Sequence, residues 1–228
     1  MNKLESKNIN LLIDFDSTII KEESLDLLST ISLKKVTNKN EVIKQITKIT
    51  TEAMEGKINF SDALTHRIKL LNAYKNHISI LIQKIQNNIT NSFIDNKQFF
   101  QENYKNCYIV SGGFLEIIYP VVKPYKIQKN NIFANQFLFN NDNKIISIDK
   151  NNLLSKDLGK VKVAKNIKGK NIIIGDGFTD YEVKKYNAAE KFIQFSENIN
   201  RKNLNPYADF IANDFNEIIN FINNNYFN

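Results

Sequence analysis

The 228-residue chain contains a single cysteine and only two histidines, and each scarcity excludes a class of protein. Cys107 stands alone inside the apolar run NCYIV, so a disulfide framework is excluded and a buried, inert thiol is expected. His66 and His77 do not have the spacing of zinc ligands. Because a lone, unpaired cysteine suits a reducing compartment, we predict a cytoplasmic protein.

Long apolar runs and low-complexity tracts are also absent from the sequence. No stretch approaches the roughly 18 apolar residues that a membrane span needs, and residues 1–10 lack the apolar segment of a secretory signal. No Pro-, Gly- or Ser-rich tract interrupts a composition that is 42% hydrophobic and 11% aromatic. We therefore expect a globular protein without membrane association.

The net charge of +7 is the compositional feature that could indicate a nucleic-acid partner. However, the lysines are scattered along a chain in which Asn, Lys and Ile are all over-used. The aromatic residues lie in apolar runs, such as NQFLFN at 135–140, and do not alternate with basic residues as they would on a single-strand binding surface. We predict no nucleic-acid partner.

Short β-branched runs that end in Gly, Asp or Ser recur along the chain and are typical of strands. They lie at 8–16, 106–113, 170–177, 191–197 and 208–214. Helical patterns follow several of them, for example at 114–122 and 179–187. This alternation predicts an α/β fold with a doubly wound, Rossmann-like and mostly parallel sheet. Residues 133–149 are expected to form a hairpin with a polar turn.

The interval from 20 to 100 differs from the rest because it carries helix-period patterns and almost no strand signal. It is inserted between the first and second predicted strands. We therefore predict a helical cap domain at 20–100, above the carboxyl edge of the sheet. The core domain would consist of residues 1–19 and 101–228.

Three of the predicted strands end in chemically active side chains. Taken singly, these segments could be helix-capping acids, a tight turn and an ordinary strand exit, and Thr179 with Glu182 matches a capping box. Because ligands of such sheets bind beyond the carboxyl ends of the strands, their joint occurrence predicts a phosphate site. The three segments are Asp14-Phe15-Asp16-Ser17-Thr18, Ser111-Gly112-Gly113 and Gly175-Asp176-Gly177-Phe178-Thr179-Asp180.

Carboxylates from two strand ends form an all-oxygen ligand set, which suits Mg²⁺ better than zinc. A divalent cation would also offset the repulsion between Asp14 and Asp16. Ser111 and the two glycines after it precede a helix expected from about Phe114, so their donors would form an anion cradle.

A cation for the phosphate is expected from the segment SKDLGKVKVAK. We favour Lys160 because it follows Gly159 at the start of a predicted helix. Lys156 and Lys162 remain alternatives.

The cap also contains one residue that interrupts an apolar helix face. A helix beginning near Ser61 places Arg67 between Ala63 and Leu71 on that face. A partly buried guanidinium needs an anionic partner, which could be a substrate carboxylate or an internal Asp or Glu. Glu23 is a weaker candidate, because it precedes a helical pattern and could merely complement the helix dipole.

These segments resemble the motifs of the haloacid dehalogenase superfamily, and more closely those of its phosphoserine phosphatases. The matching stretches are DFDSTIIKEES, VSGGF, the lysine near GKVKVAK and GDGFTDYEV, and EAMEGKINFSDALTHRIKLL resembles the cap segment. The lysine motif lacks the Gly-rich lead of many relatives, and Thr179 stands where many carry Asn.

The resemblance implies a Mg²⁺-dependent phosphatase that hydrolyses O-phosphoserine through an aspartyl phosphate, the last step of serine biosynthesis. Asp14 would be the nucleophile and Thr18 a support for the phosphate. Asp16 would be the general acid and base, which requires either a raised pKa or a proton acquired as the substrate binds and the cap closes. Mg²⁺ would bind Asp14, the Asp16 carbonyl and Asp176, with Asp180 close behind. Ser111, Gly112, Thr179 and Lys160 would hold the phosphoryl group, and Glu23 and Arg67 the amino and carboxylate groups. The alternative is an enzyme of the same superfamily that acts on another small phosphomonoester, or that transfers the phosphoryl group to an acceptor alcohol. The chain is expected to be a monomer or homodimer.

Overall fold

The computed structural model describes residues 3–227 and is built around a six-stranded sheet with the order β3-β2-β1-β6-β7-β8. Every neighbouring pair in this sheet is parallel. The central strand is buried along its whole length, as expected for a strand covered on both faces. The predicted α/β class is confirmed. The strands are β1 (Ile9–Ile13), β2 (Cys107–Phe114), β3 (Ile132–Asn135), β6 (Lys170–Gly175), β7 (Lys191–Phe195) and β8 (Phe210–Ala212).

Helices pack on both faces of the sheet, and the alternation of side chains along β1 decides which core each residue joins. Leu11 and Ile13 belong to the larger apolar cluster, which includes residues of α8 and α11. Leu12 belongs to the smaller cluster under α9 and α10. The core helices are α1 (Lys3–Ser6), α6 (Asn91–Asp95), α7 (Lys97–Glu102), α8 (Leu115–Val122), α9 (Gly159–Asn166), α10 (Phe178–Lys185) and α11 (Phe215–Tyr226). Short 3-10 turns lie at Tyr104–Asn106, Lys123–Tyr125, Lys129–Asn131, Leu153–Ser155 and Asn205–Tyr207.

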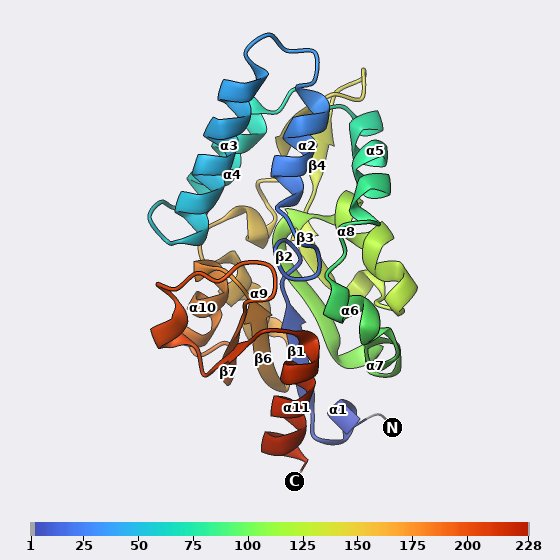
Figure 1. Cartoon of the computed structure of the whole chain (residues 1–228), viewed down its shortest axis with the longest axis vertical. Coiled ribbons are helices and arrows are strands. Elements are labelled where there is room, and N and C mark those ends of the chain that lie inside the picture. The colour runs from blue at the N-terminus through green and yellow to red at the C-terminus, as the bar shows by residue number, and fades with distance from the viewer. Residues whose placement is uncertain (1–2, 228) are drawn as a thin grey trace.

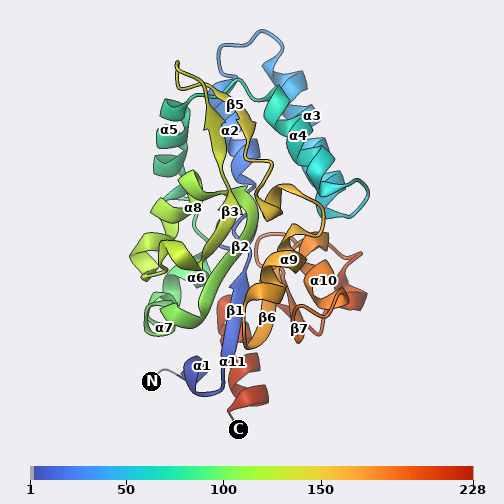
Figure 2. The ribbon, with the colours of Figure 1, turned by 180° about the vertical axis from the view of Figure 1, so that it is seen from behind.

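Four helices form a cap that stands above the carboxyl edge of the sheet (Figure 1). A two-stranded hairpin rises from the core and runs beside them, which is clearest from behind (Figure 2). The bridge between Ile20 and Ile89 pairs the two segments by which the chain enters and leaves the cap. The cap helices are α2 (Ser24–Ser32), α3 (Lys39–Met54), α4 (Phe60–Leu70) and α5 (Lys75–Ile85), and the hairpin strands are β4 (Phe137–Phe139) and β5 (Ile145–Ile148).

The sequence predicts a hairpin over 133–149, and the structure corrects where this hairpin begins. Phe133 lies in β3 and pairs with Val110 of β2, so this segment is an edge strand of the main sheet. The hairpin itself begins at Phe137. The apolar run IFANQFLF carries no Gly or Pro that would separate two strands, which is why the division at Gln136 was missed.

Helix α6 and the first part of α7 fall inside the predicted cap interval but pack on the core. Phe93 of α6 lies 4.3 Å, between ring centroids, from both Phe100 and Tyr125, and 5.3 Å from Phe215. The division of the domains at residue 100 stays a prediction. The packing of these rings places the return of the chain to the core nearer Ile89.

Two expectations drawn from the composition can be compared with the structure. Cys107 is buried in β2, as expected, and burial raises the pKa of its thiol to about 12, a direction that disfavours the reactive thiolate. None of the helices within residues 3–227 combines the length and apolarity that crossing a membrane requires.

Candidate active site

The predicted site residues converge where β1, β2 and β6 end beneath the cap. Asp14 directly follows β1, and its backbone N–H donates to the Ile174 carbonyl at 2.9 Å, so the pairing with β6 continues up to this carboxylate. Asp176 directly follows β6, and Ser111 lies near the end of β2. All three are at least 95% buried. The parallel register therefore brings the three motifs together at one edge.

Lys160 lies between two carboxylates at this edge. Its Nζ is 2.7 Å from Asp14 Oδ2 and 2.7 Å from Asp180 Oδ1. Burial alone would lower the pKa of the ammonium, but the two carboxylates together raise it above its ordinary value. Lys156 and Lys162 are exposed. Of the three lysines, Lys160 is the one that lies at this edge, where α9 presents it from its first turn, and its role toward phosphate stays a prediction.

Asp16 is partly buried in a different setting, because no lysine or arginine of the described chain forms an ion pair with it. Its Oδ1 accepts a hydrogen bond from the Ser24 backbone N–H at 2.9 Å. Burial, reinforced by the charge of Asp14, raises the pKa of Asp16 to about 7. This direction agrees with the first of the two expectations for Asp16, while its role as a general acid stays a prediction.

Asp14, Asp176 and Asp180 form a cluster that could hold a metal ion, since one carboxylate oxygen from each lies within 4.8 Å of the others. Asp180 is already engaged by Lys160 and by the backbone N–H of Gly177. Asp176 Oδ1 is buried without a hydrogen-bond partner among the described residues. An unpartnered buried carboxylate oxygen beside a second carboxylate fits a hard divalent cation.

Arg201 belongs to this site and was missed by the sequence reasoning. Its Nε donates to Asp176 Oδ2 at 2.8 Å, and its second guanidinium nitrogen lies 3.9 Å from Glu23 Oε1. Burial raises the pKa of Asp176 to about 7, and Arg201 opposes the rise. The segment NINRKN has the polarity of a solvated loop, but it follows β7. The rule that ligands bind beyond strand ends could therefore have identified it.

The predicted anion cradle differs in detail from the expectation. Helix α8 begins at Leu115, close to the expected start near Phe114, but the two glycines belong to β2, which continues to Phe114. The Gly113 N–H donates to Ser111 Oγ at 3.0 Å. A Cβ on Gly112 would lie 2.3 Å from Cζ of Phe60, a cap residue that covers this turn. Glycine is needed here because the cap approaches the backbone so closely.

Two threonines present unpartnered hydroxyls near the carboxylates. The expected capping box of Thr179 and Glu182 does not form, because α10 begins at Phe178 and Asp180 accepts from the Gly177 N–H. Thr179 Oγ1 is consequently left buried without a partner in the described chain, and so is Thr18 Oγ1. Thr179 lines the same small cavity as Asp14, whereas Thr18 is fully buried behind it.

The cap contributes the two remaining predicted residues. Arg67 in α4 is 3% exposed. Its Nη1 donates a hydrogen bond to Thr50 Oγ1 at 3.1 Å, and its Nε has no partner among the described residues. Glu23 accepts a hydrogen bond from Ser17 Oγ at 2.9 Å and makes no side-chain cap on α2. Burial, and then the charge of Asp16, raise the pKa of Glu23 to about 8.

Core and cap residues enclose a cavity of about 20 Å³. This volume accommodates about one water molecule, so the cap and the core are closely apposed over these side chains. The residues around it are Asp14, Asp16, Glu23, Leu25, Met54, Phe60, Arg67, Ser111, Gly112, Gly113, Lys160 and Thr179.

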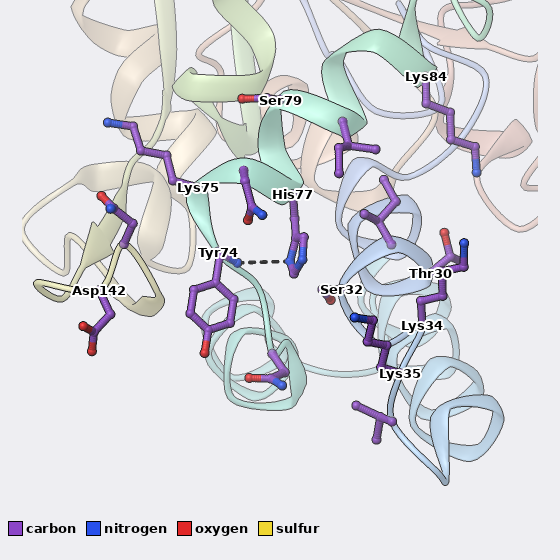
Figure 3. Close-up of a pocket in the computed structure, with 16 residues that line it drawn as sticks. Thr30, Ser32, Lys34, Lys35, Tyr74, Lys75, His77, Ser79, Lys84 and Asp142 are labelled. Carbon is purple, nitrogen blue, oxygen red and sulfur yellow. Dashed lines mark hydrogen bonds between the residues drawn. The ribbon is translucent and has the colours of Figure 1, made fainter.

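A larger hollow of about 1160 Å³ lies at the far end of the cap. Its lysines are exposed: Lys34 and Lys35 follow α2, and Lys75 and Lys84 lie in α5. The hydrogen bond drawn there joins the Tyr74 N–H to His77 Nδ1 at 3.2 Å (Figure 3). The carboxylate in its lining is Asp142. The lining of this hollow contains no second acid, so it does not repeat the pair of carboxylates, Asp14 and Asp16, found at the sheet edge.

No family model matches the chain. Among curated proteins, human phosphoserine phosphatase is 30% identical over 211 residues, which covers 90% of this chain and 89% of the human protein. The chain belongs to the phosphoserine phosphatase family. A crystal structure of a phosphoserine phosphohydrolase-like protein from Francisella tularensis is 32% identical with a TM-score of 0.84, and the match covers 93% of this chain and 99% of that one.

The family assignment confirms the resemblance seen in the motifs, and with it the haloacid dehalogenase fold and the class of enzyme, a phosphatase. A solved phospho-aspartyl intermediate analogue of phosphoserine phosphatase has the same fold, with a TM-score of 0.74 at 24% identity over 94% of this chain and 98% of that one. The roles of individual residues stay predictions.

Proposed function

We propose that this chain hydrolyses O-phosphoserine to serine and phosphate through a phosphorylated Asp14. The observation that carries the proposal is that one buried cavity joins Asp14 and Asp16 of the core to Glu23 and Arg67 of the cap. Phosphoserine has a phosphate, an ammonium and a carboxylate, and the cavity offers a complementary group for each. Similarity to a curated protein named phosphoserine phosphatase supports the same conclusion.

Recognition of the amino-acid part would rest on the cap. Arg67 is buried with an unpartnered Nε, and a guanidinium in this position gains most from a carboxylate that it can bind through two nitrogens. Glu23 would accept the ammonium group, since its carboxylate lies on the same cavity. A substrate that lacks either charge would leave one of these groups buried and unpaired.

The chemistry would begin with in-line attack of the Asp14 carboxylate on phosphorus, forming an acyl phosphate as the bond to the serine oxygen breaks. Asp16 would donate its proton to the departing oxygen, for which its raised pKa of about 7 is suited. Water would then attack the aspartyl phosphate while Asp16 takes up a proton, which releases phosphate and restores Asp14. Lys160 would reduce the repulsion between the attacking carboxylate and the phosphate throughout.

Mg²⁺ is the proposed cofactor, held by Asp14, Asp176 and the Asp16 carbonyl. When bound, it would supply charge neutralisation for the phosphoryl oxygens. Arg201 holds Oδ2 of Asp176 and leaves Oδ1 free, which orients the carboxylate toward a ligand. Thr18, Ser111, Gly112, Thr179 and Asp180 complete the proposed set, as phosphate donors or supports.

The alternative within the same chemistry is another small phosphomonoester, or transfer of the phosphoryl group to an acceptor alcohol. A cytoplasmic location, a place in serine biosynthesis, a monomeric or homodimeric state, and the absence of nucleic-acid or membrane partners also stay predictions.

Phosphate release from phosphoserine, phosphoethanolamine and p-nitrophenyl phosphate, each with and without EDTA, tests the proposal. We expect the highest kcat/KM for phosphoserine, loss of turnover with EDTA and recovery with Mg²⁺. Equal kcat/KM for all three substrates would instead indicate a phosphatase without amino-acid recognition.

The variant Arg67→Ala further distinguishes a phosphatase that recognises phosphoserine from one without amino-acid recognition. Loss of a buried charged partner should raise KM for phosphoserine about 100-fold, while KM for p-nitrophenyl phosphate changes little because that substrate has no carboxylate. An equal rise in KM for both substrates would contradict the assignment of Arg67 to the substrate carboxylate.

A further inference from the structure

Three side chains from three cap helices form a hydrogen-bonded series that ends on Arg67. Thr50 of α3 is 2% exposed, and its Oγ1 lies 3.1 Å from NH1 of Arg67 in α4. The same Oγ1 lies 2.8 Å from Oδ1 of Asp26 in α2. The series Asp26–Thr50–Arg67 therefore connects three helices behind the cavity.

The direction of these hydrogen bonds follows from the donors available. Arg67 can only donate, so Thr50 Oγ1 accepts from it and has one proton left to give. Two acceptors are in reach, Asp26 Oδ1 at 2.8 Å and the Ile46 carbonyl at 3.1 Å. The shorter contact is to a carboxylate, and charge-assisted hydrogen bonds are the stronger ones. The hydroxyl therefore gives its proton to Asp26 and its lone pair to Arg67.

We propose that Thr50, oriented by Asp26, is a positioning residue that aims the Arg67 guanidinium at the carboxylate of the substrate. The inference rests on the proposed phosphoserine phosphatase activity and adds a determinant of its specificity. Neither Thr50 nor Asp26 lines the cavity, so each would act only through Arg67.

A hydroxyl is suited to this task because it orients the guanidinium without neutralising it. A carboxylate at position 50 would form an ion pair with Arg67 and compete with the carboxylate of the substrate. Without the hydroxyl, the long side chain of Arg67 would be free to turn toward Glu23, whose carboxylate lines the same cavity. That contact would occupy both groups proposed to bind the amino-acid part, so holding Arg67 in place preserves two contacts with the substrate.

The test replaces Thr50 by Val, which keeps the branched shape and removes the hydroxyl. The measured quantity is the ratio of kcat/KM for phosphoserine to kcat/KM for phosphoethanolamine, which lacks only the carboxylate. We expect about a tenfold fall in this ratio, through KM for phosphoserine with kcat little changed, as for the loss of one hydrogen bond to a charged group. Thr50→Ser should stay close to wild type because it restores the hydroxyl.

Thr51→Val is the matched control. Thr51 is the next residue of α3, and its hydroxyl also bonds to the carbonyl four residues earlier, Thr47 O at 3.0 Å, but it is exposed and has no contact with Arg67 among the described residues. Its substitution should leave the ratio unchanged. Asp26→Asn should lower the ratio in the same direction as Thr50→Val but less, and it keeps the inference testable if Thr50→Val does not fold.

The inference is overturned if Thr50→Val leaves the ratio unchanged, or lowers turnover of both substrates equally, because a purely structural role would not distinguish them. Wild-type protein without preference for phosphoserine would overturn the proposed function, and the inference with it. Wild-type protein with that preference, together with an unchanged ratio in Thr50→Val, would overturn the inference alone.

Discussion

Apart from Asp16, the acids at the sheet edge are paired with a lysine or an arginine, whereas the charged groups of the cap are held mainly by hydroxyl groups. In the core, Lys160 bridges Asp14 and Asp180, and Arg201 bonds to Asp176, all at 2.7 or 2.8 Å. In the cap, Arg67 bonds to a threonine. Glu23, at the cap entrance, bonds to a serine and meets Arg201 only at 3.9 Å.

This difference matches a division of labour between the two regions. Paired charges are compensated before any ligand arrives, so the core edge is organised for phosphoryl transfer whichever phosphomonoester is present. A guanidinium with an unpartnered nitrogen gains free energy when a ligand supplies the partner. Selection among substrates is therefore expected to reside in the cap, and each variant below tests one side of this division.

The largest effect is expected from Asp14→Asn at the core edge. An amide cannot act as the nucleophile, so kcat should fall by at least about 10⁴-fold for phosphoserine and for p-nitrophenyl phosphate alike. The fold should persist, because the amide keeps the shape of the carboxylate and its single oxygen can still accept one of the two hydrogen bonds, from Lys160 or from the Phe15 N–H, that Oδ2 and Oδ1 of Asp14 accept. Phosphate release measures the activity and circular dichroism checks the fold. Asp142→Asn, at an exposed position, is the control. Near-native activity of Asp14→Asn in a clean preparation would contradict the assignment of Asp14 as the nucleophile.

The sequence predicted the core edge well because the relevant side chains sit within a few residues of recognisable strands. Asp14 and Asp176 follow β1 and β6 directly, and the parallel register alone brings them together. Arg201 lies on a loop with no periodic pattern, and its role depends on contacts between residues 25 positions apart in the chain. Thr50 was missed for a related reason. A buried threonine on a helix is common, and only the tertiary packing of α2, α3 and α4 gives it two charged neighbours.

The second prediction concerns the metal-free protein, where the same buried acids should make stability depend on pH. Burial raises the pKa of Asp16 and of Asp176 from 3.8 to about 7, and that of Glu23 from 4.5 to about 8. At pH values between the ordinary pKa and the raised pKa of each acid, the folded state binds more protons than the unfolded state. The free energy of unfolding is therefore greatest at the low end of this pH range and falls as pH rises. Thermal unfolding in EDTA should show a lower Tm at pH 8 than at pH 6.

Mg²⁺ should raise the Tm more at pH 8 than at pH 6, because the carboxylates must be ionised to bind it. Asp176→Asn is the matched variant, since it removes one titrating group and should flatten the dependence on pH. A Tm that is flat or rises between pH 6 and pH 8 in the metal-free protein would show that these acids are not held protonated by burial.

The smallest effect is expected from the far end of the cap, where Lys34 and Lys75 line the larger hollow. Both side chains are exposed and surrounded by solvent, so their charges are screened over about 8 Å at physiological salt. Lys34→Ala and Lys75→Ala should therefore leave kcat/KM for phosphoserine within about twofold of wild type, because exposed charges contribute little to a remote site. Measuring kcat/KM at low and at physiological salt separates local binding from long-range attraction of the substrate. A tenfold loss that persists at physiological salt would mean that this end of the cap contacts the substrate directly. Selection by the cap would then not be confined to the end that faces the sheet.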